Sequence, residues 1–323
     1  MSSRPHLGFE RDVAELQAEI DRLLELADRK GTDVSGELRE LRSRLERLTG
    51  ESRWSLSAFE KVQVARHPRR PYTLDYVERI FTDWIELHGD RAFRDDAAVV
   101  GGWARLEGAP LMVVGHQKGR SMKENLRRNF GMPHPEGYRK ALRLMRLAEK
   151  FGRPVVTFID TPGAYPGVGA ERRGQAEAIA TNLREMARLR IPTISVVIGE
   201  GGSGGALALG LTDRILVLEH AIYSVISPEG CAAILWRSAD ERERAAEALR
   251  LTAGDLEEFG VADEIIPEPA GGAHTDWDAQ AEAVRTVLLR HLGEVTRLGA
   301  RERGPCRHGK YRAIGAWRHG GGT

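Results

Sequence analysis

Apolar residues in the first fifty positions recur at the spacing of amphipathic helices. Between positions 9 and 23, and again between 38 and 48, they follow one another at steps of three and four residues. A break near residues 31–36 separates the two patterns. We therefore expect residues 1–50 to form a helical hairpin arm. Because a thin hairpin buries little surface by itself, contact with another subunit is favoured over simple coverage of the core.

The pattern then changes from helical to strand-like. Residues 54–88 continue the helical spacing, apart from positions 67–71, where two prolines require an extended link. Thr73 is expected to cap the helix that follows this link. Residues 98–106 and 111–116 are short apolar runs joined by a turn-rich connection, which predicts a β-hairpin.

Two similar strand, loop and helix units follow. Residues 154–159 are apolar and lead into a glycine-rich loop, after which a single long helix is predicted over 171–189. Residues 192–210 repeat this order, with the glycine turn Gly199–Gly205 between strand and helix. In a parallel sheet both loops emerge at the same edge, where ligands usually bind.

The remainder of the chain is predicted to alternate between short strands and helices. A helix over 136–150 precedes the two glycine loops, and another over 278–292 follows the last strand. Short strands are expected at 214–218, 222–225 and 261–266. Residues 301–323 carry six cations against one acid and end in glycines, so this basic C-terminal tail is expected to be loose or partner-bound.

Composition narrows the class of protein. The 323 residues, 41% of them hydrophobic, suffice for one large or two modest domains, and the net charge of +1 gives no general attraction to nucleic acid. Two cysteines, Cys231 and Cys306, exclude a self-contained four-cysteine zinc site and argue against a disulfide scaffold. Neither a signal peptide nor a membrane span is indicated, so we expect a cytoplasmic protein.

The glycine turn at 199–205 fits three chemistries, and the first needs a bound dinucleotide. Gly199-x-Gly201-x-x-Gly204 matches the fingerprint of dinucleotide-binding oxidoreductases, and Glu219 follows at about the distance of a ribose-binding acid. The fingerprint normally occupies the first strand–helix unit of its domain, whereas several strand-like runs precede this one.

The other two chemistries concern acyl groups and anions. Gly201-x-Ser203-x-Gly205 matches the nucleophile elbow of serine hydrolases, for which an aspartate and then a histidine such as His274 should follow. Alternatively, the backbone amides of Gly204 and Gly205 form an oxyanion hole and need no side-chain nucleophile. A glycine turn that serves only close packing is a fourth, less favoured alternative.

A basic loop precedes the first glycine loop. Five cations and one acid lie between positions 118 and 128, interleaved with glycine. Charge runs of this kind usually only solubilise a surface, but a shaped loop could bind a phosphate or a carboxylate. Lys118, Arg127 and Arg128 are therefore candidate anion-binding residues. His116 and His134 lack metal-ligand spacing, and no metal site is predicted in this chain.

Long unbroken stretches of the chain match the motifs of a known family. These are Arg66-His67-Pro68, Pro71-Tyr72-Thr73, Gly115–Gly119, Arg128–Pro133, Ile159–Ala170, Gly199–Ala206 and Tyr223–Cys231. With these stretches the chain resembles, from residue 9 to residue 291, the alpha subunits of bacterial acetyl-coenzyme A carboxylase carboxyltransferases.

The resemblance implies a crotonase-like α/β fold of repeated ββα units over residues 51–295, flanked by the helical arm and by the basic tail at 296–323. It implies an enzyme that moves a carboxyl group from carboxybiotin to acetyl-coenzyme A, giving malonyl-coenzyme A in the committed step of fatty acid biosynthesis. Gly204 and Gly205 would form the oxyanion hole, with Ser203 a turn residue. The loop of Gly163, Ala164, Tyr165, Pro166 and Gly167 would line the biotin side.

The same resemblance implies several partners. A separate beta subunit would carry a zinc ribbon and most coenzyme A contacts. The two cysteines of this chain agree with its having no ribbon of its own. Biotin would arrive on a biotin carboxyl carrier protein, with biotin carboxylase in the full complex. An assembly of two alpha and two beta subunits is expected, without membrane or nucleic acid.

Overall fold

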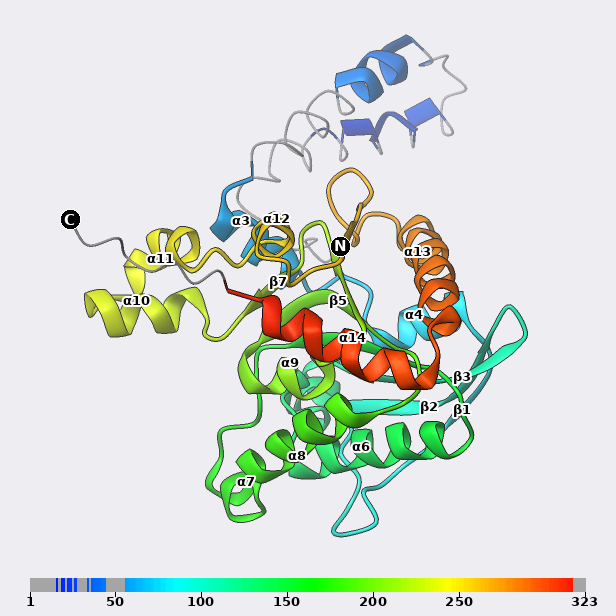
Figure 1. Ribbon diagram of the computed structural model, residues 1–323. Coiled ribbons are helices and arrows are strands. Elements are labelled where there is room, and N and C mark those ends of the chain that lie inside the picture. Colours follow the sequence, from blue (N-terminus) through cyan, green and yellow to red (C-terminus); the bar gives the residue numbers. More distant parts are fainter. Residues whose placement is uncertain are drawn as a thin grey trace, which may run out of the picture.

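The computed structural model describes residues 16, 19–20, 22–24, 26–27, 34, 36–44 and 56–315. Its centre is an eight-stranded sheet in the order β1-β2-β3-β4-β5-β6-β8, with β7 paired to β5 (Figure 1). The strands are β1 (Thr82–Glu86), β2 (Val99–Leu106), β3 (Ala109–His116), β4 (Val155–Thr161), β5 (Thr193–Gly202), β6 (Arg214–Leu218), β7 (Ile222–Ser224) and β8 (Glu264–Ile266).

Helices cover both faces of this sheet. The α-helices are α3 (Ala58–Ala65), α4 (Thr73–Ile80), α5 (Met122–Arg127), α6 (Pro135–Lys150), α7 (Val168–Arg172), α8 (Gln175–Arg188), α9 (Ser203–Gly210), α10 (Pro228–Trp236), α11 (Arg242–Leu249), α12 (Ala253–Glu258), α13 (Trp277–Arg297) and α14 (Ala300–Ala313). Helices α4 and α13 pack together on one face, and α6 and α9 contact the other, with α8 outside them (Figure 1). Every residue of β4 is consequently buried.

Strand direction divides the sheet into two parts. Strands β1, β2 and β3 are antiparallel neighbours, whereas β3, β4, β5, β6 and β8 run parallel. The predicted hairpin is confirmed, since Leu106 pairs with Ala109 across a two-residue turn. Glu107 and Gly108 both adopt positive φ values, of 48° and 76°, as the twist of a tight hairpin requires.

The sequence prediction is wrong at the end of the second helical stretch. Residues 82–86 form strand β1 rather than more helix, because pairing with β2 supplies hydrogen bonds at the sheet edge that outweigh local helix propensity. Thr73 does not cap α4. Tyr72 is the N-cap residue, and the Thr73 hydroxyl donates instead to the carbonyl of His116 at 2.5 Å.

The helix predicted over 171–189 is divided into α7 and α8. The break falls at Gly174, whose φ of 81° lies in the left-handed region that glycine adopts readily. Gly174 is the N-cap residue of α8. The glycine loop therefore ends in one short helical turn before the longer helix begins.

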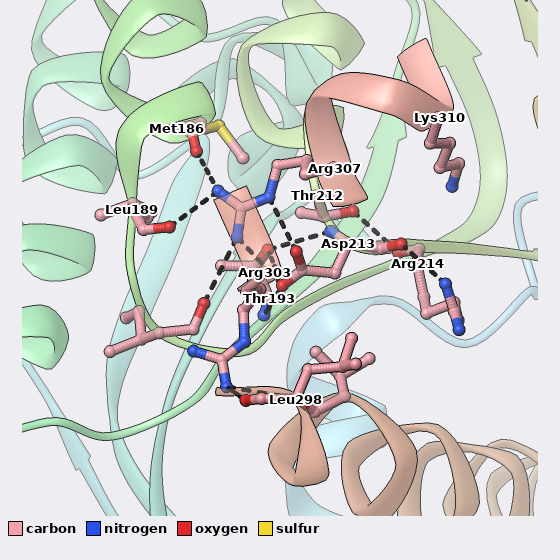
Figure 2. A network of polar contacts seen from close by, with 12 residues as sticks. Met186, Leu189, Thr193, Thr212, Asp213, Arg214, Leu298, Arg303, Arg307 and Lys310 are labelled. Carbon is pink, nitrogen blue, oxygen red and sulfur yellow. Dashed lines mark hydrogen bonds and ion pairs between the residues drawn. The ribbon is translucent and has the colours of Figure 1, made fainter. Parts of the chain in front are cut away.

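The basic tail differs most from expectation. Residues 300–313 form α14, and Arg303 and Arg307 are buried, so the prediction of a loose tail is wrong for this segment. Figure 2 shows the Arg307 guanidinium directed at Asp213 and at the end of α8. It bonds both carboxylate oxygens of Asp213, at 2.9 and 3.0 Å, and the carbonyl of Met186 at 2.6 Å. The ion pair of Arg307 with Asp213 holds α14 against the rest of the fold. Residues 316–323 of the predicted tail lie outside the described residues.

The N-terminal arm is described only at scattered positions. Those within 16–44 are helical apart from Val34, and the side chains of Leu16 and Ile20 are buried. Helical structure therefore occurs on both sides of the predicted break. The hairpin arrangement and its contact with another subunit stay predictions.

Candidate active site

The two glycine loops meet at the carboxyl ends of β4 and β5. A Cβ atom on Gly202 would lie 2.2 Å from the carbonyl oxygen of Pro162. A Cβ atom on Gly205 would lie 2.6 Å from the carbonyl carbon of Gly163 and 2.7 Å from the nitrogen of Ala164. Glycine is needed at both positions because the two main chains touch. The structure thus brings together the two loops that the sequence singled out.

The second loop opens directly into helix α9. Gly202 is the N-cap residue and supplies no side-chain hydrogen bond, and Ser203 adopts a left-handed φ of 53°. Gly204 and Gly205 belong to the first turn, whose amides lack partners within a helix. The positive end of the helix dipole also lies here. This geometry suits an oxygen that becomes negatively charged.

The first loop is held in place by its neighbours. The amide of Gly163 donates to the Thr161 hydroxyl at 3.1 Å, and the amide of Tyr165 donates to the carbonyl of Pro133 at 3.0 Å. The ring of Tyr165 lies against that of His134, with 4.2 Å between centroids. Gly163 is buried, Ala164, Tyr165 and Gly167 are half-buried, and Pro166 is exposed. The part nearest Gly205 is therefore the most enclosed.

Lys118 reaches the stems of both loops. Its Nζ atom lies 2.6 Å from Oδ1 of Asp160 and 3.9 Å from Oε2 of Glu200. Burial is the largest single influence and would lower the pKa of Lys118, but the charges of Asp160 and Glu200 and the hydrogen bond to Asp160 together outweigh it and raise the pKa. The ammonium group is therefore charged and already has carboxylate partners.

Arg127 and Arg128 lie elsewhere on the basic loop. Arg127 is exposed at the end of α5, a helix with no buried residue. Arg128 is half-buried and donates to the carbonyl of Ala97 at 2.9 Å, while burial and the charge of Arg127 lower its pKa. Within residues 56–315 no hydrogen bond or ion pair joins either arginine to the glycine loops.

His116, which the sequence did not single out as a site residue, lies beside the site. The side chain is fully buried, and its Nδ1 atom accepts a hydrogen bond from the amide of Asp160 at 3.4 Å. Burial lowers the pKa of His116 to about 4, so the ring is neutral at pH 7. The sequence offered one indication that His116 lies near the site, namely its place at the end of a predicted strand, next to the basic loop.

Four further residues of the site were not identified from the sequence. Asp160 and Glu200 were visible as lone acids at the entrances of the glycine loops. Arg66 and Glu229 come from distant segments, and Arg66 bridges Glu200 and Glu229 at 2.8 and 2.7 Å. Only the fold reveals that these four charged residues and Lys118 form one connected series of ion pairs.

The structure does not favour the two alternative chemistries. Gly199 and Gly201 lie inside β5 rather than in a loop between strand and helix, so the dinucleotide fingerprint lacks its required context. Ser203 has the left-handed backbone of a nucleophile elbow, but its hydroxyl makes no hydrogen bond to a histidine in the described part of the chain. His274 instead stacks on His67, with ring centroids 3.9 Å apart.

An apolar cleft of about 340 Å³ opens beside the glycine turn. Ser203 and Leu207 of α9 line one side, and Tyr311 and Ile314 lie at the C-terminal side. Val225 also lines the cleft and is 74% exposed. Among the described residues, no group of three or more potential ligands could hold a metal ion, and no helix is long and apolar enough to cross a membrane.

Proteins of similar sequence share one name. A protein of Halorhodospira halophila is 56% identical over 309 residues, which cover 96% of this chain and 97% of that protein. A protein of Gemmatimonas aurantiaca is 58% identical over 301 residues, covering 92% and 94% of the two chains. Both are named acetyl-coenzyme A carboxylase carboxyl transferase subunit alpha.

Solved structures agree on the fold. Transcarboxylase 12S, with methylmalonyl-coenzyme A bound, superimposes with a TM-score of 0.53 at 23% identity over 67% of this chain and 41% of that chain. A Pseudomonas malonate decarboxylase hetero-tetramer in complex with coenzyme A gives a TM-score of 0.55 at 21% identity over 68% and 89%. The expected crotonase-like α/β fold is confirmed.

Membership of a family follows from coverage as well as from identity. The family model described as "Acetyl co-enzyme A carboxylase carboxyltransferase-like" matches residues 6–315, which include every element of the sheet and both glycine loops. The likeness that the sequence motifs indicated therefore extends over almost the whole molecule. This chain belongs to the acetyl-coenzyme A carboxylase carboxyltransferase family, as a relative of its alpha subunits.

Proposed function

We propose that this chain is the alpha subunit of an acetyl-coenzyme A carboxylase carboxyltransferase. With a beta subunit it transfers the carboxyl group of carboxybiotin to acetyl-coenzyme A and forms malonyl-coenzyme A, the committed step of fatty acid biosynthesis. The observation that carries this proposal is the close contact of two glycine loops at the first turn of α9. Family membership defines the reaction to which that geometry is applied.

The reaction creates negative charge on oxygen, and backbone amides can stabilise it. Carboxybiotin supplies the carboxyl group, and its release leaves charge on the ureido oxygen, while removal of a methyl proton from the thioester produces an enolate. The amides of Gly204 and Gly205 provide one oxyanion hole, and the beta subunit provides the other. Loss of one such donor typically costs about 2.7–4 kcal/mol of barrier. The methyl proton passes to the ureido nitrogen that has lost the carboxyl group, so no side chain of this chain acts as the base.

The Gly163–Gly167 loop forms the biotin side of the site. The position of the loop supports this assignment, because the peptide between Gly163 and Ala164 lies against Gly205. A Cβ atom on Gly205 would occupy the space where these backbones meet, so the two loops can lie this close only with glycine at position 205. Biotin belongs to a separate carrier protein, and acetyl-coenzyme A enters as the second substrate.

The site is completed by partners. The beta subunit, with its zinc ribbon and most coenzyme A contacts, covers the apolar cleft beside Ser203, since exposed apolar surface of this kind marks interaction sites. The helical arm at 1–50 contacts another subunit in an assembly of two alpha and two beta subunits. The biotin carboxyl carrier protein and biotin carboxylase complete the cytoplasmic complex. Arg127 and Arg128 remain candidates for binding coenzyme A phosphates, the carrier or the beta subunit.

A pair of alanine substitutions tests the oxyanion hole. In Gly205→Ala the new methyl group would meet the backbone of Gly163 and Ala164 at 2.6 and 2.7 Å, so the loops must separate. In the matched control Gly204→Ala it meets only the Ile179 side chain, at 3.6 Å, and the amide is kept. Each variant is reconstituted with the beta subunit, and malonyl-coenzyme A formation from carboxybiotin is measured.

We expect Gly205→Ala to lose at least about 100-fold in kcat, consistent with loss of one oxyanion donor, while the control keeps most activity. Gly205→Val should abolish transfer, and all variants should still bind the beta subunit. Wild-type turnover by Gly205→Ala would remove Gly205 from the site. Absence of malonyl-coenzyme A with the wild-type chain and its beta partner would reject the proposed function itself.

A further inference from the structure

A chain of five charged residues lies beneath the two glycine loops. Lys118 contacts Asp160 and Glu200, Arg66 contacts Glu200, and Arg66 also contacts Glu229. The amide of Glu200 donates to Oδ1 of Asp160 at 3.0 Å, so these two acids are linked through the backbone as well. We call these five residues the charge chain.

The charge chain is most enclosed at Asp160. The side chains of Lys118, Asp160 and Glu200 are 14%, 4% and 10% exposed. Charge buried to this degree is costly unless it is paired, and removing one partner leaves the other uncompensated. Lys118 therefore stabilises two carboxylates that would otherwise repel each other.

Each of these carboxylates lies on the stem of a different loop. Asp160 is three residues before Gly163, and Glu200 is four residues before Gly204. The Lys118 ammonium group is the contact that joins the two stems through side chains. Its position consequently influences how the Gly163–Ala164 peptide lies against Gly205.

Two glycines make room for this arrangement. A Cβ atom on Gly131 would lie 2.6 Å from Cγ of Lys118, and one on Gly199 would lie 2.7 Å from Oδ1 of Asp160. The lysine stem and the aspartate carboxylate are thus each packed against bare backbone. This packing restricts where the ammonium group can lie.

We propose that Lys118 is a positioning residue for carboxyl transfer, and this inference rests on the proposed function. By joining Asp160 and Glu200 it holds the two glycine loops at the separation in which the Gly204 and Gly205 amides form the oxyanion hole. Lys118 does not contact substrate. A displacement of about 1 Å at a reacting centre can cost 100-fold in rate, so a positioning residue of this kind affects kcat rather than substrate binding.

Lys118→Met tests the inference, because methionine keeps an unbranched stem beside Gly131 and removes the charge. The variant is reconstituted with the beta subunit, and kcat and KM for acetyl-coenzyme A are measured beside the mass of the complex. We expect kcat to fall at least about tenfold with KM within twofold of wild type. Lys150→Met, an exposed lysine at the end of α6, is the matched control and should match wild type.

A double variant separates positioning from simple packing. Asp160→Asn alone keeps an acceptor for the Glu200 amide, and we expect it to lower kcat because Lys118 loses its nearest partner. The double variant Lys118→Met with Asp160→Asn lacks the same link that each single substitution breaks, so its kcat should equal that of Lys118→Met to within about twofold. If the loss came from packing alone, the effects of the two substitutions would multiply.

Three outcomes would overturn the inference. They are a kcat within twofold of wild type in Lys118→Met, a rise in KM with unchanged kcat, and wild-type turnover by Asp160→Asn. The Asp160→Asn result decides the matter if Lys118→Met fails to assemble. If wild type and Lys150→Met both form no malonyl-coenzyme A, the proposed function fails instead, so the two failures are distinguishable.

Discussion

Arg307 on α14 offers the sharpest test of how the C-terminal helix is fixed. Arg307 is 2% exposed, and its guanidinium bonds both oxygens of Asp213 together with the carbonyls of Met186, Leu189 and Ile191. Arg307→Met keeps much of the apolar stem and removes all of these bonds. Asp213 would retain only the amide and hydroxyl of Thr193, at 2.8 and 3.0 Å.

The size of the effect follows from the charge left behind. Removing one partner of a buried ion pair typically lowers the free energy of unfolding by roughly 3–5 kcal/mol. The amide and hydroxyl of Thr193 still bond one oxygen of Asp213, which keeps the cost toward the lower end of this range. We therefore expect Arg307→Met to lower the free energy of unfolding, or of local α14 release, by about 3–4 kcal/mol.

Two measurements distinguish local from global loss. Urea unfolding reports the global free energy, and hydrogen exchange of the α14 amides reports release of that helix alone. Exchange should accelerate by roughly 100- to 1000-fold if α14 leaves while the sheet stays folded. Arg301→Met, exposed on the same helix, should change stability by less than about 0.5 kcal/mol. Exchange within tenfold of wild type in Arg307→Met, with unchanged urea unfolding, would refute this account of α14.

Two further predictions concern Ser203 and His116. Ser203→Ala should keep most transfer activity, and the wild-type serine should resist fluorophosphonate labelling, because its hydroxyl has no histidine partner among the residues that the structure describes. Abolished transfer in a folded variant would instead support the hydrolase alternative. Burial lowers the pKa of His116 to about 4, below its ordinary value of 6.5, so the unfolded chain binds the proton more readily. The stability that His116 contributes is therefore complete above about pH 6.5 and is lost as the pH falls toward 4, by about 2 kcal/mol at pH 5. Urea unfolding of wild type and His116→Gln at pH 7 and pH 5 measures this difference, and equal acid sensitivity of the two proteins would contradict it.

The parts of the fold that local sequence determines were predicted well. The hairpin of β2 and β3 follows from two apolar runs and a turn at Glu107–Gly108, and the two strand–loop–helix units follow from β-branched runs that end in glycine. Strand β1 was missed because its structure depends on pairing with β2, a contact that helix periodicity cannot reveal. Helix α14 was missed for a similar reason, since its cations look solvated until Asp213 is placed beside them.

The candidate site likewise has a part that local sequence predicts and a part that only the fold brings together. The sequence identified both glycine loops, because clustered glycine next to a strand is a local signal of close backbone approach. It assigned Lys118 to anion binding on charge alone, and could not show that Asp160 and Glu200 already accept its ammonium group. Arg66 and Glu229 are 163 positions apart, so their contact depends on the complete fold.

The contact between Gly205 and the Gly163–Ala164 peptide has a consequence for how such a site is studied. On the proposed mechanism the recognition elements are main-chain amide dipoles, so reagents that trap serine, cysteine or lysine side chains would have no catalytic group to attack. A scan that replaces only side chains by alanine would pass over Gly204 and Gly205. Inhibitor design would then be better served by a small planar anion mimic than by a reactive electrophile.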